Sequence, residues 1–225
     1  MTNLKKIAAA CAVAASLAAG SAAAEPILLD FEGIADFAAI NDFYNGGTDS
    51  NGASGVNYGV GFSADSIGLT DSDAGGYGTI GGMPSGVGGL TFFSGRGAVM
   101  DVGGGVETSL GFHYAAGEAG FVRVFEGLNG SGTLLGTVNL GTNISGCLDG
   151  NNLFCVFDPV QLQFAGTARS VVFGGADGWI TFDDVRIGAD VEEPPAQVPE
   201  PATLALSALG LAGFAAARRK ARKSQ

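Results

Sequence analysis

Short runs of β-branched and aromatic residues, separated by glycine, follow one another through most of the chain. Between residues 25 and 188 they include PILLDF, AVMDV, TSLGFHYA, GFVRVFEG, RSVVFGG and WITFDDVRIG, several with alternating apolar and polar positions. Such short strands, with turns about every 8 to 12 residues, are typical of sandwiches and barrels. The sequence NGSG between two alternating runs indicates a hairpin. The body is therefore predicted to be all-β, an antiparallel β-sandwich of the jelly-roll type, over residues 25–188.

A glycine-rich, low-complexity segment, DSDAGGYGTIGGMPSGVGG, covers residues 71–89. Loops this long within a compact domain are usually functional or mobile. Asp71, Asp73 and Gly75 resemble the start of an EF-hand loop, but position 12 of that pattern is Gly82 rather than glutamate. At most, this indicates a loose surface cation site.

Charge is distributed very unevenly along the chain. All 22 Asp and Glu residues lie between Glu25 and Glu200, whereas seven of the 11 Lys and Arg residues lie near the two ends. Residues 25–200 keep four arginines and no lysine, so four positive charges against 22 negative ones give this stretch a net charge of −18. Such a surface repels nucleic acid and anionic headgroups. Nucleic-acid binding is therefore excluded.

The first 24 residues have the composition of a secretory signal peptide. Lys5 and Lys6 precede an apolar run, and a small-residue stretch ends at Ala24. This order predicts a signal peptide over residues 1–24 and hence export. Cys11 lies in a sequence with a faint likeness to a lipoprotein processing site, and we interpret it as a signal-peptide residue.

The C-terminal end is predicted to insert into a membrane. Residues 202–217 are uncharged and would span about 24 Å as a helix, against a hydrocarbon core of about 30 Å. A soluble helix would need a polar face, which this segment lacks. Because the basic residues of 218–225 follow at once, we expect a transmembrane helix with a cytoplasmic tail, joined to the body by a linker over residues 189–201.

Val198, Pro199, Glu200 and Pro201, followed by this apolar segment and its arginine-rich end, resemble the PEP-CTERM sorting signal of Gram-negative bacteria. The resemblance implies an exosortase as partner and delivery from the inner membrane to the cell surface or the exopolysaccharide matrix. The two prolines hold the backbone extended, which leaves the Glu200 carboxylate accessible to such an enzyme.

Two cysteines, Cys147 and Cys155, lie close together in CLDGNNLFC. In an exported chain an even pair usually forms a disulfide, here around a turn-rich loop. Metal ligation is the alternative, but two cysteines without neighbouring histidines supply only half of a zinc site.

The segments LLDFEG and WITFDDVRIG give the body a resemblance to jelly-roll modules of the carbohydrate-binding or galactose-binding type. The resemblance implies a structural calcium held by Glu32 and Asp183. Strand periodicity also places Asp183 on one face with Val185 and Ile187, and a buried carboxylate needs a partner such as a hard cation. The alternative is that Asp183 lies in water at a rim, with Asp30 and Glu32 as ordinary surface charges.

No catalytic residue is identified. His113 is the sequence's one histidine, and no G-x-S-x-G elbow accompanies it. Carboxylate pairs are too numerous to single out a glycosidase pair. Trp179, Tyr44, Tyr58 and Tyr77 are candidates for stacking on a sugar ring, and for Trp179 a place in the core is the alternative.

These observations favour an exported, membrane-anchored or surface-sorted protein with a binding or structural role in the cell envelope or matrix, and with polysaccharide as a candidate partner. A carbohydrate-active hydrolase on the same scaffold is one alternative. Ice binding is another, although the regularly spaced threonines expected for it are missing. The ligand itself stays unknown at this level.

Overall fold

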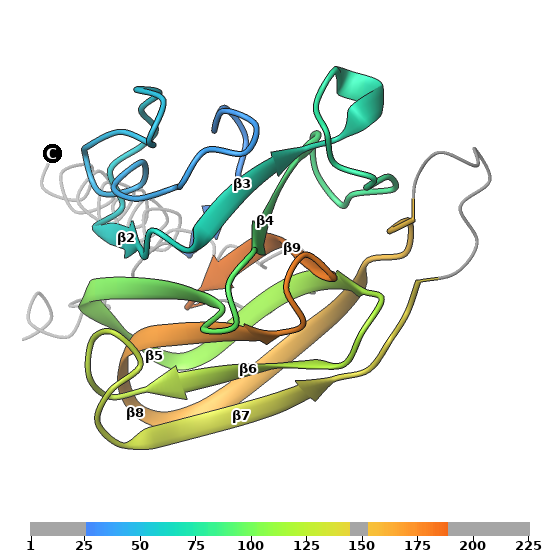
Figure 1. The fold of residues 1–225 in the computed structure, drawn as a ribbon. Coiled ribbons are helices and arrows are strands. Elements are labelled where there is room, and N and C mark those ends of the chain that lie inside the picture. Colours follow the sequence, from blue (N-terminus) through green and yellow to red (C-terminus); the bar gives the residue numbers. More distant parts are fainter. Residues whose placement is uncertain (1–25, 145–152, 189–225) are drawn as a thin grey trace, which may run out of the picture. The chain divides into compact units, whose positions relative to one another are not determined.

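The computed structural model describes residues 26–144 and 153–188, which form antiparallel β-structure (Figure 1). Apart from one 3-10 turn, η1 (Ser72–Ala74), the regular elements of these residues are the strands β1 (Ile27–Leu29), β2 (Val60–Phe62), β3 (Ser66–Thr70), β4 (Gly88–Phe92), β5 (Ala98–Ala116), β6 (Gly120–Phe125), β7 (Leu134–Leu140), β8 (Asp158–Gly175) and β9 (Ile180–Ile187). The predicted all-β, antiparallel architecture is confirmed. The predicted signal peptide, linker, membrane helix and basic tail lie outside the described residues.

Two long strands, β5 and β8, connect the layers of the sandwich. The strand order is β3-β4-β9-β5-β8-β6-β7, with β1 beside β9 and β2 beside β5. The first part of β5 pairs with β2 and with the last part of β8, which in turn pairs with β6. The second part of β5 pairs with β9 and with the first part of β8. Each long strand therefore contributes to both layers.

A glycine run lets β5 change direction without ending. The pairing of β5 with β8 shifts register between Asp101 and Val106, where Gly103, Gly104 and Gly105 lie. Gly105 has φ +80°, which favours glycine, and a Cβ there would collide with the side chain of Thr167. Such a bulge bends a strand and increases its twist.

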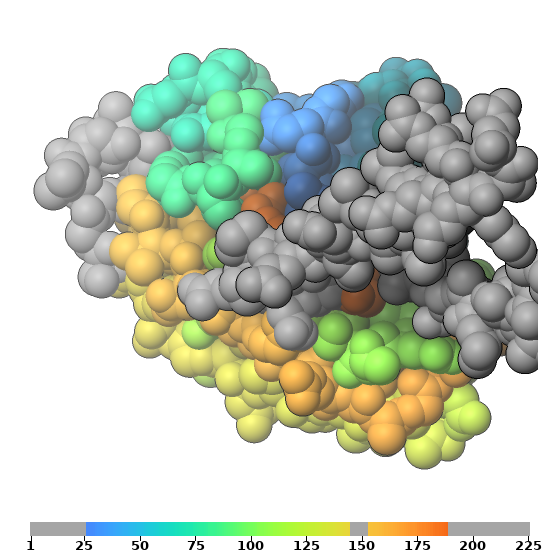
Figure 2. All heavy atoms as spheres, turned by 180° about the vertical axis from the view of Figure 1, so that it is seen from behind, coloured from blue at the N-terminus to red at the C-terminus, as the bar shows by residue number. Residues whose placement is uncertain are grey.

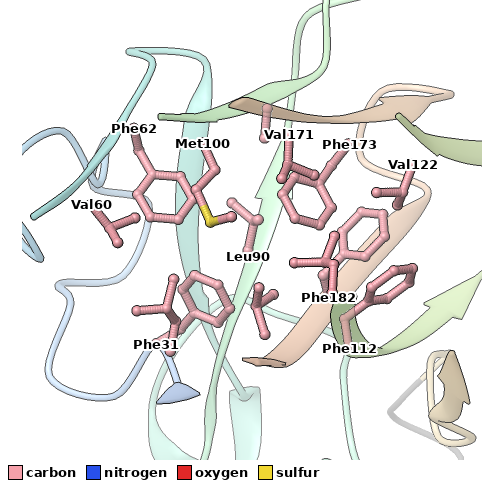
Figure 3. Packing of buried hydrophobic residues seen from close by; sticks show 14 of the residues in the cluster. Phe31, Val60, Phe62, Leu90, Met100, Phe112, Val122, Val171, Phe173 and Phe182 are labelled. Carbon is pink, nitrogen blue, oxygen red and sulfur yellow. The ribbon is translucent and has the colours of Figure 1, made fainter. Parts of the chain in front are cut away.

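The core lies between the inner faces of the two layers (Figure 3). Phe173 of β8 meets Phe182 of β9 edge-on, with ring centroids 4.9 Å apart, and Phe112 of β5 contacts both rings at 6.2 and 5.8 Å. Met100 and Leu90 fill the space beside them and are fully buried. Three of the largest core side chains therefore come from the strands that hold the layers together.

A second, smaller cluster anchors the glycine-rich segment. Ile80, Ala115 and Phe154 are buried together, and a bridge joins Ile80 to Phe154. Figure 2 shows the first part of the chain, coloured blue to teal, above the strands coloured yellow and orange. The segment between β3 and β4 is thus packed against the sandwich, which fixes the side chains that it carries.

We predict that Phe182→Ala lowers the free energy of unfolding by about 3 to 5 kcal/mol, because it leaves a cavity beside the phenyl rings of Phe112 and Phe173. Leu134, which is 50% exposed on β7, serves as the control, and Leu134→Ala is expected to change stability by at most about 0.5 kcal/mol. Urea denaturation followed by tryptophan fluorescence measures the free energy of unfolding of both variants. Equal stability of the two variants would contradict the assigned core.

Candidate functional site

Three exposed aromatic side chains, of which Phe37 contacts the other two, form the aromatic patch, defined as Phe37, Tyr77 and Phe93. Their exposed fractions are 49%, 80% and 50%. The ring of Phe37 stacks on Phe93 at 5.5 Å and meets Tyr77 edge-on at 5.9 Å. The three residues follow β1, η1 and β4 respectively, so the fold gathers them from separate parts of the chain. A contiguous set of exposed rings of this kind marks a binding surface more often than a stability feature.

Backbone hydrogen bonds hold two of these residues in place. The N–H of Phe37 donates to the carbonyl of Gly68 at 2.9 Å. The carboxylate of Asp36 accepts from the N–H of Tyr77 at 3.0 Å and from that of Thr70 at 2.8 Å. Phe37 also has φ +58°, a left-handed conformation that is strained for a bulky side chain. Strain that the surroundings maintain is often found at functional sites.

Asp49 fixes the segment that carries Phe37. Its carboxylate is buried and accepts from the N–H groups of Ala35 at 2.9 Å, Asn51 at 2.8 Å and Ala53 at 2.9 Å. Burial alone would raise the pKa of Asp49, but these backbone donors lower it below its usual value. Asp49 therefore stays ionised and ties the loop together.

Phe93 is supported by the turn before β9. Gly178 has φ +69°, and a Cβ there would lie 2.8 Å from Cε1 of Phe93. The N–H of Gly178 donates to the carbonyl of Phe92 at 2.8 Å. Trp179 follows directly, is 45% exposed and meets Phe154 of the second cluster edge-on at 6.4 Å. Trp179 thus lies at the surface and not in the main core.

The predicted sugar-stacking tyrosines have different environments. Tyr77 belongs to the aromatic patch, whereas Tyr44 is buried and its hydroxyl accepts from the N–H of Phe31 at 2.8 Å. Burial and the nearby negative charge of Asp30 raise the pKa of Tyr44 well above its usual value. Tyr58 is partly exposed and stacks on Tyr44 at 6.2 Å. Tyr44 is therefore closed to a ligand.

The two carboxylates predicted to hold calcium meet the same segment between β3 and β4. Asp183 on β9 is fully buried, and its oxygens accept from the N–H groups of Ser85 at 3.3 Å and Asp184 at 2.7 Å. Glu32 accepts at one oxygen from the N–H groups of residues 87 and 88, at 2.7 and 2.6 Å. Asp183 therefore does not lie at a water-exposed rim.

The surroundings of Asp183 disfavour its charged form. Burial, together with the charges of Asp184 and Glu32, raises the pKa of Asp183 to about 8, although two backbone donors oppose the shift. Arg186 pairs with Asp184 at 3.1 Å and not with Asp183. Among residues 26–144 and 153–188, however, no three His, Cys, Asp or Glu side chains are grouped as metal ligands. Backbone carbonyls and water would have to complete a calcium shell.

His113 lies on β5 opposite Asp183 of β9. Its Nδ1 is buried without a hydrogen-bond partner among the described residues, and burial lowers the pKa of the ring. The imidazole is therefore neutral at physiological pH, and no hydrogen bond in the described part of the chain links it to a nucleophile. A Ser-His-Asp arrangement gains no support.

Asp71 caps the 3-10 turn, because its carboxylate accepts from the N–H of Asp73 at 2.9 Å, and Gly75 ends the turn in a left-handed conformation. The EF-hand-like residues thus form a capped turn. Cys147 and the sorting residues Val198 to Pro201 lie outside the described residues, so the pairing of Cys147 with Cys155 stays a prediction.

Residues 197–220 match the PEP-CTERM protein-sorting motif. The predicted resemblance of this tail is confirmed, and the chain carries the signal of an exported, surface-sorted protein that exosortase processing recognises. The described residues contain no helix long and apolar enough to cross a bilayer. The helix predicted over residues 202–217 lies outside them, and the Gram-negative origin stays a prediction.

The body is similar to solved carbohydrate-binding structures. CsCBM6-3 from Clostridium stercorarium, in complex with cellobiose, is 26% identical over 49% of this chain and 81% of that chain, with a TM-score of 0.34. A β-1,3-glucan binding CBM6 from Bacillus halodurans is 15% identical over 56% and 87%, with a TM-score of 0.34. A family 43 arabinoxylan arabinofuranohydrolase from Bacillus subtilis is 17% identical over 63% and 30%, with a TM-score of 0.37. No curated protein matches the chain.

We predict that stability in metal-free buffer falls as the pH rises from about 4 to about 8. Asp183 has a folded-state pKa of about 8 against its ordinary value of 3.8, so the folded protein binds more protons in this window. Asp183→Asn should be less sensitive to pH there. Calcium at about 100 times its Kd would add about 2.7 kcal/mol at pH 8, or roughly 5 to 10 °C for a domain of this size.

Differential scanning fluorimetry in chelator and in calcium, at several pH values, measures these effects. Calcium is expected to change the melting temperature of Asp183→Asn very little. If excess chelator leaves the melting temperature of the wild type unchanged, and Asp183→Ala also leaves it unchanged, the protein has no calcium site at Asp183.

Proposed function

We propose that the exported body binds polysaccharide through the aromatic patch. The observation that supports this proposal is that Phe37 contacts both Tyr77 and Phe93 while each of the three side chains remains about half exposed or more. The apolar C–H face of a pyranose ring packs well on an aromatic face, and aromatic side chains give large contact area at little entropic cost.

The position of the rings supports recognition of an extended chain. Phe37 stacks on Phe93 and meets Tyr77 in an edge-on arrangement, so these contacts join three exposed rings into one apolar surface. Their loops are fixed by Asp36 and Asp49, so little conformational entropy is lost on binding. A surface of this form suits a polymer better than a small metabolite.

Charge narrows the class of polysaccharide. Residues 25–200 carry a net charge of −18, so the exported part of the chain repels uronate-rich or sulfated polymers. We propose neutral polysaccharide as the ligand of the aromatic patch. Calcium at Glu32 and Asp183 would have a structural role here, because it would tie the segment before β4 to β9, and the segment over residues 202–217 would anchor the body in the membrane.

We predict that Tyr77→Ala weakens retention on neutral polysaccharide by about tenfold, equivalent to about 1.4 kcal/mol. Tyr77 is the cleanest test because it is 80% exposed and its loss leaves the core intact. The double variant Phe37→Ala, Phe93→Ala should abolish retention. The exposed control Leu134→Ala should bind like the wild type.

Affinity electrophoresis of the full-length chain in gels with cellulose derivatives, β-1,3-glucan or xylan measures retention, and reducing-end assays on the same mixtures detect cleavage. Unaltered retention in both patch variants would contradict the proposal. Product release without retention would favour the hydrolase alternative instead.

A further inference from the structure

A polar hollow of about 330 Å³ lies apart from the aromatic patch and shares no residue with it. Its walls come from the loop before β2, from β5 and from the loop after β6, and it is lined by Asp42, Asn45, Gly61, Asp101, Gly103 and Asn129, among others. The volume is at the lower end of the range of small-molecule sites, about 300 to 1,000 Å³.

Gly61 and Gly103 are two of the residues that line this hollow. Gly61 on β2 pairs with Asp101 on β5. A Cβ at Gly61 would lie 3.6 Å from Oδ1 of Asp42 and 3.9 Å from Nδ2 of Asn45, while a Cβ at Gly103 would meet nothing within 4 Å. Neither glycine has a positive φ, so the backbone does not require glycine at either position. Because glycine has no side chain, Gly61 and Gly103 leave space between the carboxylates of Asp42 and Asp101.

The carboxylates of Asp42 and Asp101 each accept a side-chain or backbone hydrogen bond at one oxygen only. Oδ1 of Asp101 accepts from the N–H of Asn129 at 2.7 Å, and Oδ1 of Asp42 accepts from Nδ2 of Asn45 at 3.0 Å. The Oδ2 atoms make no hydrogen bond or ion pair with any residue in the described part of the chain. Two positioned acceptors are thus available to a ligand.

No arginine or lysine lines the hollow, and no ion pair among the described residues joins a cation to Asp42 or Asp101. Arg96 pairs with Asp65 and Arg186 with Asp184, while Arg123 lies over the ring of Phe121. Arg169 lines a different pocket, which shares Leu128 and Asn129 with the hollow. Two like charges that face one hollow are unfavourable until a ligand supplies positive charge. The amides of Asn45 and Asn129 add both donors and acceptors for hydroxyl groups.

We propose that the polar hollow binds an amino sugar, with the free ammonium group of a hexosamine unit between Asp42 and Asp101 and its hydroxyl groups on the two asparagine amides. An ammonium group is a compact donor of three hydrogen bonds, which matches two separate acceptor oxygens. A neutral sugar leaves both charges uncompensated, and an acidic sugar is repelled. The ligand class is a partly deacetylated glucosamine polymer, and the site is independent of the aromatic patch.

Isothermal titration calorimetry of the full-length chain with glucosamine tetramer tests the proposal. The tetramer should bind at least about tenfold more tightly than its N-acetylated form or cellotetraose, and its affinity should fall as salt is raised. Asp42→Asn and Asp101→Asn should each weaken binding about tenfold. Gly61→Leu should block the hollow without backbone strain.

Leu134→Ala is the matched control and should leave tetramer binding unchanged. Tyr77→Ala reports on the aromatic patch through retention on neutral polysaccharide, so a failed aromatic patch and a failed hollow are distinguishable. Melting temperatures of the hollow variants within about 2 °C of the wild type establish that they fold. Equal affinity for the acetylated tetramer, no effect of either aspartate variant, or loss of binding in Leu134→Ala would each overturn the site. Binding of calcium alone that Asp101→Asn abolishes would assign the hollow to a metal ion instead.

Discussion

The pairing of β5 with β8 is the contact on which both layers depend. The first part of β5 lies beside β2 and the second part beside β9, while β8 pairs with β6 at its far end. Phe112 and Phe173, one from each long strand, touch in the core. β5 itself contributes Asp101 and Gly103 to the polar hollow, whereas β4, which precedes Phe93 of the aromatic patch, reaches β5 through β9.

The alternation of apolar and polar residues was sufficient to predict strands and their antiparallel order. The turn sequence NGSG at residues 129–132 predicted the hairpin that joins β6 to β7. Alternation could not predict the long strands. AVMDV and TSLGFHYA look like separate strands because glycine usually interrupts a strand, yet Gly103 to Gly105 form a bulge within β5. Whether glycine ends or bends a strand depends on the partner strand, here β8, and that partner is not visible in the local sequence.

The candidate site was predictable only in part. Periodicity and the jelly-roll resemblance pointed to Asp183 and Glu32, and both do meet the segment before β4. Tyr77 was a candidate, but Phe37 and Phe93 were not, because phenylalanine in a β-protein is normally core. Only the tertiary fold brings the loops after β1, η1 and β4 together. The left-handed backbone of Phe37 is equally invisible in the sequence.

Hydrogen exchange of the full-length chain, with and without a neutral polysaccharide that it retains, tests the central claim most directly. The account predicts slower amide exchange in residues 34–39, 72–79 and 93–97, which carry the aromatic patch, and no change in β6 and β7. Protection confined to β6, β7 and their connecting loop, with the patch loops unchanged, would contradict it.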